Sequence, residues 1–250
     1  MLLTFDIGNT TIKTGTFDNG KLFNRFRLKK MEDLLTLLEN DEYLFAAYSS
    51  VVPEKSDIIN CSNFDKPVYQ ITSKSKFNID FSNYSMDSLG VDRICSLEGA
   101  LSRFKEKSNS EFDYLITIDC GTATTMNVVK YPNIFLGGLI APGVTTMFKS
   151  LQKNTSQLPM ITPDDFKHLI GTNTNESIAS GVITSTVGMI TKVLMSLNPR
   201  KKKRMEVYVT GGNAIKILDH LHFKHFYEEY LVLYGIKELF YLNAKEQVVD

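Results

Sequence analysis

The stretch that decides the fold is LLTFDIGNTTIK, residues 2–13, because its pattern returns as LITIDCGTATTMNVV at residues 115–129. Each copy reads as an apolar strand, an aspartate at the strand's end, a glycine-centred turn rich in hydroxyl groups, and a returning strand. The two aspartates, Asp6 and Asp119, lie 113 residues apart. The repeat predicts two like halves that offer one turn each to a cleft.

Both turns carry groups that suit phosphate. The glycine of D-x-G lets backbone N–H groups approach an anion. Lys13 adds a point charge, and the carboxylates of Asp6 and Asp119 suit Mg²⁺ or another hard cation. One copy alone would be explained by an ordinary hairpin with an Asx-type turn, whereas two copies favour an enzyme that uses a nucleotide. The threonines that add neutral donors are Thr10, Thr11, Thr122, Thr124 and Thr125.

The composition is that of an ordinary globular chain. Of its 250 residues, 43% are hydrophobic and 22% charged, and 28 basic side chains balance 28 acidic ones. This balance favours neither nucleic acid nor an anionic membrane as a partner. We expect no signal peptide and no apolar run long enough to span a bilayer. Three scattered cysteines without a C-x-x-C pattern predict reduced thiols and a cytoplasmic protein.

Periodicity and turn residues predict a mixed α/β fold with one lobe over residues 1–111 and another over 112–250. In the first lobe we expect strands at 1–6, 11–17, 21–28 and 43–50, helices at 31–40 and 89–105, and a short helix opened by Pro53. The region 73–88 looks irregular, and a linker lies near residue 110. In the second lobe we expect strands at 114–119, 123–130, 134–140 and 207–210, and helices at 145–152 and 176–197. Gly181 and Gly188 in the last helix predict close packing against another backbone, including a second subunit.

Two further segments are candidates for chemistry. LGVDR, residues 89–93, places an acid beside a cation ahead of a periodic helix. Asp92 can act as a general base toward a hydroxyl, with Arg93 binding a carboxylate or phosphate, but an N-cap ion pair explains the spacing equally well. TGGNA, residues 210–214, has paired glycines on which adenine can lie, although a simple strand-to-helix turn explains it too.

Two other features favour plain structural interpretations. The histidines of HFKHF and its surroundings, His220, His222 and His225, have mixed spacing that does not set three ligands on one helical face. The basic run RKKKR, residues 200–204, lacks interleaved aromatic residues and predicts a solvated loop rather than a nucleic-acid patch.

Taken in order, eight motifs resemble the type III pantothenate kinase family, and the match covers residues 1 to about 243. That family belongs to the acetate and sugar kinase, chaperone and actin superfamily, so the resemblance implies a two-lobed actin-like, ribonuclease H-like ATPase fold with duplicated mixed sheets. The motifs are DIGNTTIK (6–13), GVDR (90–93), DCGTATT (119–125), GGLIAPG (137–143), LP (158–159), IGTNT (170–174), SG (180–181) and TGG (210–212).

The resemblance implies a role for each matching position. ATP phosphates would lie on residues 6–13 and Thr122, with Mg²⁺ and Asp6 as its candidate ligand, and the adenosine would face Gly211 and Gly212. Asp119 would bind a monovalent cation, potassium or ammonium. Asp92 would accept the proton. The first turn consists of Asp6, Ile7, Gly8, Asn9, Thr10, Thr11, Ile12 and Lys13, and the pantothenate site of Gly90, Val91, Asp92, Arg93 and Thr174, with Tyr84 at a shifted spacing.

The resemblance therefore implies a cytoplasmic homodimer that converts pantothenate to 4'-phosphopantothenate with ATP, the first step of coenzyme A biosynthesis. Two departures from the family pattern stand out. Met86 occupies a position that is often proline, and Asn127 one that is often aspartate, which removes a negative charge near the nucleotide and can alter cation binding. The alternatives are another small-molecule kinase of the superfamily and a non-catalytic accessory or regulatory protein.

Overall fold

The computed structural model describes residues 1–40, 42–62, 64–108 and 110–244, which form two compact units. Unit 1 contains residues 1–110, residues 132–136 and the chain from Tyr230 onward, and unit 2 contains residues 111–131 and 137–229. The sequence-based division instead assigned everything after residue 111 to the second lobe. It differs because residues 231–244 form a helix that packs in unit 1, and no local pattern in the sequence signals that return.

Unit 1 is built on a five-stranded sheet of order β3-β2-β1-β4-β5. Strand β1 runs antiparallel to β2 and parallel to β4. Because side chains alternate along a strand, Leu3, Phe5 and Ile7 share one face and enter an apolar core with residues of two helices, α1 and α2. The elements are β1 (Leu2–Ile7), β2 (Ile12–Asp18), β3 (Lys21–Leu28), α1 (Met31–Leu38), β4 (Phe45–Ser50), α2 (Pro53–Cys61) and β5 (Val68–Gln70).

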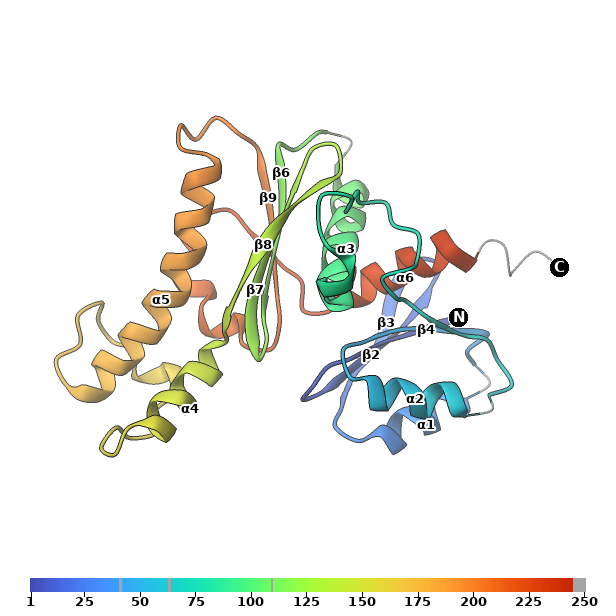
Figure 1. Ribbon diagram of the computed structural model, residues 1–250, viewed down its shortest axis with the longest axis horizontal. Coiled ribbons are helices and arrows are strands. Elements are labelled where there is room, and N and C mark those ends of the chain that lie inside the picture. The colour runs from blue at the N-terminus through green and yellow to red at the C-terminus, as the bar shows by residue number, and fades with distance from the viewer. Residues whose placement is uncertain (41, 63, 109, 245–250) are drawn as a thin grey trace. The chain divides into compact units, whose positions relative to one another are not determined.

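Two further helices of unit 1, α3 (Val91–Lys107) and α6 (Leu231–Ala244), cross each other at very short range (Figure 1). A Cβ atom at Gly99 would overlap the carbonyl of Leu231, and one at Gly235 would overlap the carbonyl of Cys95. Bare glycine backbone on both helices therefore permits this approach. The crossing fixes α3, whose first turn carries Asp92.

Unit 2 repeats the strand order as β10-β9-β6-β7-β8, with β6 antiparallel to β7 and parallel to β9. One face of β6 and β9 packs its apolar side chains against α4 and α5 in a second core. The elements are β6 (Tyr114–Cys120), β7 (Ala123–Lys130), β8 (Ile134–Pro142), α4 (Val144–Asn154), α5 (Thr174–Leu197), β9 (Met205–Thr210) and β10 (Phe226–Tyr227).

The predicted strands and long helices are present, and the structure adds the 14-residue helix α6, which was not expected, and several short elements. Strands β5 and β10, of three and two residues, were not expected. The helix predicted from residue 176 begins at Thr174, because the Asn173 side chain accepts the N–H of Glu176 as its cap. After the paired glycines there are two 3₁₀ turns, η3 (Ala214–Lys216) and η4 (Leu218–His220), and the irregular region holds η1 (Met86–Ser88). A last 3₁₀ turn, η2, covers Pro163–Asp165.

The expectation that no apolar run is long enough to cross a membrane is wrong for α5. By length and composition alone, Thr174–Leu197 passes that test, with a mean hydropathy of 1.5 over its best 18 residues, 39% of which are buried. Ala179, Val182, Ile183 and Ile190 pack in the core of unit 2, which accounts for much of that apolar character.

Candidate active-site residues

The first Asp–Gly turn joins β1 to β2 and closes through one backbone hydrogen bond. Ile7 and Ile12 pair across the strands and are fully buried, so they hold the two ends of the turn. Between them the N–H of Gly8 donates to the carbonyl of Thr11 at 3.1 Å. Asn9 and Thr10 are exposed at the tip. The buried Ile7–Ile12 pair therefore anchors a turn whose backbone N–H groups and hydroxyl groups are available as donors.

Asp6, the acid of this turn, lies opposite Lys13 on β2 and Ser49 on β4. The hydroxyl of Ser49 donates to Asp6 Oδ1 at 2.8 Å. The fully buried thiol of Cys95, on α3, has its pKa raised well above the ordinary value, first by burial and next by the negative charge of Asp6, with smaller contributions from Asp92 and Glu98. The negative charges of Asp6 and Asp92 thus both raise the pKa of the same buried thiol. Ser49 was missed from sequence because a serine within a strand carries no motif.

Asp92 lies in the first turn of α3. Gly90 is the N-cap of that helix and makes no side-chain cap, so the N-cap interpretation of Asp92 is wrong. The N–H of Arg93 donates to Asp92 Oδ1 at 2.8 Å. Burial raises the pKa of Asp92, while that N–H and the Arg93 charge oppose the rise. A carboxylate with a raised pKa is a stronger proton acceptor than a solvated one.

Arg93 is buried, and its guanidinium carbon lies 5.7 Å from the centre of the Tyr84 ring. The Tyr84 ring in turn makes an edge-to-face contact with Phe135 at 5.2 Å. The structure therefore brings Tyr84 beside the GVDR segment, although its spacing in the sequence is shifted. Met86 lies in η1, between Tyr84 and Gly90 along the chain.

The segment that leads to Tyr84 is anchored by a buried acid that sequence reasoning missed. Glu98, on α3, accepts the backbone N–H groups of Asn78 and Ile79 at 2.8 and 3.0 Å and the Asn78 side-chain amide at 2.9 Å. Burial raises the pKa of Glu98 in spite of these donors. The polar region expected to be irregular is thus tied to the helix that carries Asp92.

The second Asp–Gly turn, in unit 2, is enclosed by backbone from two other segments. The N–H of Gly121 donates to the carbonyl of Ala123 at 3.0 Å, and the N–H of Gly143 donates to that of Thr122 at 2.9 Å. Gly211 has a φ of +96°, and a Cβ atom there would lie 2.5 Å from the backbone nitrogen of Cys120 and overlap the Asp119 carboxylate. The Asp119 carboxylate therefore lies against bare backbone, with Gly212 next in the chain and exposed.

A polar network that sequence reasoning also missed braces this turn. The Asn213 side chain donates to the carbonyl of Gly121 at 2.8 Å, and Thr145 Oγ1 donates to Asn213 Oδ1 at 2.8 Å. The Lys216 ammonium donates to Asn213 Oδ1 at 2.7 Å and to Thr145 Oγ1 at 2.8 Å. Thr146 Oγ1 donates to the carbonyl of Thr122 at 2.7 Å. The TGGNA motif drew attention to this region only for its paired glycines, and the hydrogen bonds of Asn213 were not predicted.

Three other predicted positions complete the account of unit 2. Thr174 is exposed at the first position of α5, so it and the GVDR segment belong to different units. Asn127 is buried and donates to Thr117 Oγ1 at 3.3 Å, two inter-strand pairs away from Asp119 and Thr125. Cys120 is buried, and burial raises the pKa of its thiol to about 12, which fits the packing role expected for it.

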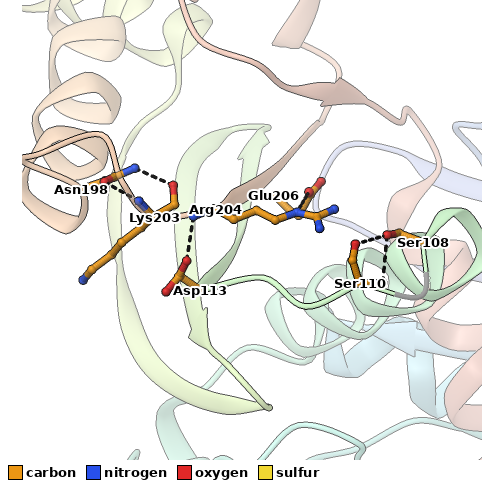
Figure 2. Close-up of polar contacts among 7 residues, drawn as sticks. All are labelled: Ser108, Ser110, Asp113, Asn198, Lys203, Arg204 and Glu206. Carbon is orange, nitrogen blue, oxygen red and sulfur yellow. Dashed lines mark hydrogen bonds and ion pairs between the residues drawn. The ribbon is translucent and has the colours of Figure 1, made fainter.

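The basic segment after α5 is held largely by its own neighbours (Figure 2). Asn198 exchanges two hydrogen bonds with the backbone of Lys203, and the N–H of Arg204 donates to Asp113. Arg204 Nε pairs with Glu206 at 2.9 Å. Arg200, Lys201 and Lys202 are exposed. The His220 ring makes an edge-to-face contact with the Phe166 ring, and the His225 ring forms a hydrogen bond with the Phe223 carbonyl.

Solved structures of other proteins share this fold. The chain superimposes with a TM-score of 0.61 on a Baf family protein from Campylobacter jejuni, at 20% identity over 96% of this chain and 97% of the other. For a ROK family glucokinase from Streptomyces griseus the TM-score is 0.54, at 11% identity over 95% and 98% of the two chains. The predicted actin-like, ribonuclease H-like ATPase fold is confirmed.

Sequence comparisons then give the family. The model of the type III pantothenate kinase family matches residues 2–196. The type III pantothenate kinase of Persephonella marina is 29% identical over 96% of this chain and 98% of its own length. That of Fervidobacterium nodosum is 31% identical over 88% and 90%. The chain belongs to the type III pantothenate kinase family, as its motifs indicated.

Proposed function

We propose that this protein transfers the terminal phosphoryl group of ATP to the primary hydroxyl of pantothenate, the first step toward coenzyme A. One observation carries the proposal. In a chain of this family, two Asp–Gly turns occupy corresponding ends of two sheets with the same strand order. Phosphoryl transfer asks an enzyme mainly for positioning and for neutralisation of charge, and these turns supply donors, carboxylates and a lysine.

The residues present fit a nucleotide with a divalent ion. The cradle at Gly211 has no space for a Cβ atom beside Asp119, which suits close approach of a ligand to bare backbone. In unit 1 the turn from Asp6 to Lys13 would hold phosphate oxygens, with Asp6 near the divalent ion. In unit 2 Thr122 would contact a phosphate, and Gly211 and Gly212 the adenosine. When bound, ATP supplies the phosphoryl group and the divalent ion neutralises part of its charge.

Asp92 is the proposed proton acceptor for the pantothenate hydroxyl. Its burial raises its pKa, so it takes up a proton more readily than a solvated aspartate. The Arg93 N–H holds one of its oxygens at 2.8 Å and fixes the direction of the carboxylate. The proton passes to Asp92 as the new bond between oxygen and phosphorus forms.

The acceptor's carboxylate needs a cationic or polar partner. Arg93 is buried and its guanidinium lies over the Tyr84 ring, so we assign this group to the substrate, together with Gly90 and Val91 of the same segment. Thr174 is a second proposed contact, from unit 2. A site built around a charged contact rejects uncharged acceptors, because the buried charge would lose its partner.

We also propose a potassium or ammonium ion at Asp119. The carboxylate lies at the end of β6 against the Gly211 backbone, and the carbonyl oxygen of Ala123 lies on the same side of Gly121 as the carboxylate. Among the described residues no group of three or more histidine, cysteine or acidic side chains is placed to hold a metal. A weakly hydrated monovalent ion suits such a mixed oxygen site.

The proposed protein is a cytoplasmic homodimer joined through α5. The outward side of this helix carries Gly181, Thr184, Ser185 and Gly188, and the space around both glycines is open. Small residues four apart let a second helix approach closely. All three cysteines are free, which fits a reducing compartment.

A coupled assay with ATP and Mg²⁺ tests the function directly. We expect turnover with pantothenate and background rates with hexoses, acetate and glycerol. Turnover of any of those three instead would support another kinase of the superfamily. Binding of ATP or pantothenate without turnover of any acceptor would support an accessory protein. Light scattering of the purified protein tests the dimer, with Gly188→Leu expected to give monomers.

A further inference from the structure

Two lysines outside every predicted site, Lys55 and Lys216, occupy corresponding positions in the two units. In unit 1 the strand parallel to β1 is β4, which places Ser49 opposite Asp6. In unit 2 the strand parallel to β6 is β9, which places Thr210 opposite Asp119. Each lysine comes six residues after the residue that faces the aspartate, Lys55 after Ser49 and Lys216 after Thr210.

Both ammonium groups are linked to the glycine of the Asp–Gly turn in their own unit. Lys55, in the first turn of α2, donates to the carbonyl of Gly8 at a long 3.5 Å. Lys216, at the end of η3, donates to Asn213 Oδ1 at 2.7 Å, and Asn213 donates to the carbonyl of Gly121 at 2.8 Å. The link is direct in unit 1 and passes through one side chain in unit 2.

These ammonium groups are held by neutral oxygens. Within the described ranges, neither lysine has a carboxylate within ion-pair distance, whereas Lys237 and Arg204 do. An ammonium has three N–H donors. Lys55 uses one of them and Lys216 uses two, on Asn213 and Thr145. Both side chains are only partly exposed, so each holds an incompletely neutralised charge beside a turn built for anions.

We propose that Lys55 and Lys216 each bind a phosphate oxygen of the nucleotide at the turn of their own unit. The inference rests on the proposed function and adds two contacts to it. A lysine acts toward phosphate as a movable point charge, so Lys55 exchanges its weak bond to Gly8 for a charged one when phosphate arrives. Its recurrence at the same position of a duplicated topology is the main argument against a chance surface lysine.

The alternative is that each lysine only braces its turn. A lysine that only braces its turn would affect the stability of the unliganded protein. Its effect on binding would not depend on the number of phosphates on the ligand. A phosphate contact would affect ATP and ADP strongly and AMP weakly, and it would follow the charge of the side chain. These differences separate the two roles.

The test measures binding of Mg-ATP, Mg-ADP and AMP by calorimetry, without pantothenate, to the native chain and to Lys55→Met and Lys216→Met. The matched controls, Lys21→Met and Lys130→Met, remove an exposed lysine from the opposite end of each sheet. We expect each test variant to weaken ATP and ADP about tenfold and AMP less than threefold, as loss of one charged hydrogen bond implies. Lys55→Arg should keep most of the ATP affinity, and both controls should match the native chain.

Equal ATP affinity in the native chain and both test variants would overturn the inference while leaving the proposed function intact. A variant that melts at a lower temperature but binds ATP normally would likewise assign that lysine to bracing alone and overturn its part. A native chain that binds no ATP would overturn the proposed function and this inference together.

Discussion

The two Asp–Gly turns share one topology but differ in what holds them. The first is closed by a single backbone bond from Gly8 to Thr11, and its acid receives a bond from Ser49 within the sheet. The second is enclosed by Gly143 and Gly211 and braced by Asn213. The difference teaches that duplicated phosphate turns need not do the same work. The first lies in the unit of Asp92, the proposed proton acceptor, and the second is more rigidly held.

The largest effect should come from Asp92, on the chemical side of this comparison. Asp92→Asn should lower turnover by roughly 10²–10⁴-fold, the usual contribution of a positioned acid–base group, and leave ATP affinity unchanged. Steady-state kinetics and calorimetry measure the two quantities. Asp87→Asn, an exposed acid in η1, is the matched control and should behave like the native enzyme. Near-native turnover of Asp92→Asn would remove this residue from the mechanism.

The same carboxylate predicts two opposite pH effects. Activity needs the ionised form, so kcat/KM for pantothenate should fall as pH drops through a value above the ordinary 3.8 of aspartate. Stability has the other sign. Because the folded pKa is raised, the contribution of Asp92 to stability is fully present below that ordinary value and is lost as pH rises through the raised pKa. Asp92→Asn should therefore melt no lower than the native chain at pH 7, and a lower melting temperature would contradict the burial argument.

Next in size is the contrast between two glycines. Gly211→Ala should cost about 3 kcal/mol of stability, because its φ of +96° is unfavourable for a side chain and the new methyl group meets Asp119 and Cys120. Gly8→Ala should cost less than about 1 kcal/mol, since its φ is not in the left-handed region and the nearest atom, the carbonyl oxygen of Thr11, lies 3.2 Å away. Urea unfolding measures both. Equal losses of stability in the two variants would contradict the inference that the second turn is held more rigidly than the first.

The cation assignment gives a smaller, specific effect. Replacing sodium by potassium or ammonium should raise turnover about tenfold, and Asp119→Asn should remove the response, since loss of one charged ligand weakens ion binding by about that factor. Asp6→Asn should lower turnover while keeping the potassium response. Equal rates in sodium and potassium for the native enzyme would refute the site and direct attention to Asn127, which lies on neighbouring strand positions.

The smallest effect concerns the residues that face the two acids. Ser49 donates to Asp6, whereas its counterpart Thr210 donates to the carbonyl of Glu229. Ser49→Ala should therefore lower kcat several-fold, about the contribution of one ordinary hydrogen bond. Thr210→Val should change stability by a similar free energy and leave kcat alone. Equal losses of kcat in both variants would show that the two positions still act alike.

Much of this molecule can be predicted from its sequence, because the signals are local. Alternating apolar residues and an Asn-Gly turn predict the strands, and the recurrence of D-x-G predicts the two halves. The acid of GVDR lies in the first turn of α3, as its helical periodicity predicts. A repeated motif is visible because each copy is contiguous in the chain.

The rest depends on contacts between distant segments. Parallel pairing of β1 with β4 and of β6 with β9 brings the ends of distant strands together, and no spacing in the chain predicts that pairing. The residues whose roles depend on it are Ser49, Asn213 and Lys216. The return of α6 to unit 1 depends on Gly99 and Gly235, each of which reads by itself as an unfavourable helix residue. The spacing of Tyr84 to Gly90 looked shifted because contacts with Arg93 and Phe135, rather than distance along the chain, place Tyr84 beside the GVDR segment.

The crossing of α3 and α6 also has a consequence for how the chain matures during synthesis. The helix that carries Asp92 packs against residues 231–244, which are synthesised long after it. Unit 2 is complete by residue 229, so the half that comes second in the sequence has all its residues first. Unit 1 cannot finish folding until α6 has been made, because this helix packs on strands that were synthesised much earlier. Until then the apolar strands of unit 1 are incompletely covered, which leaves an interval in which chaperones can bind them.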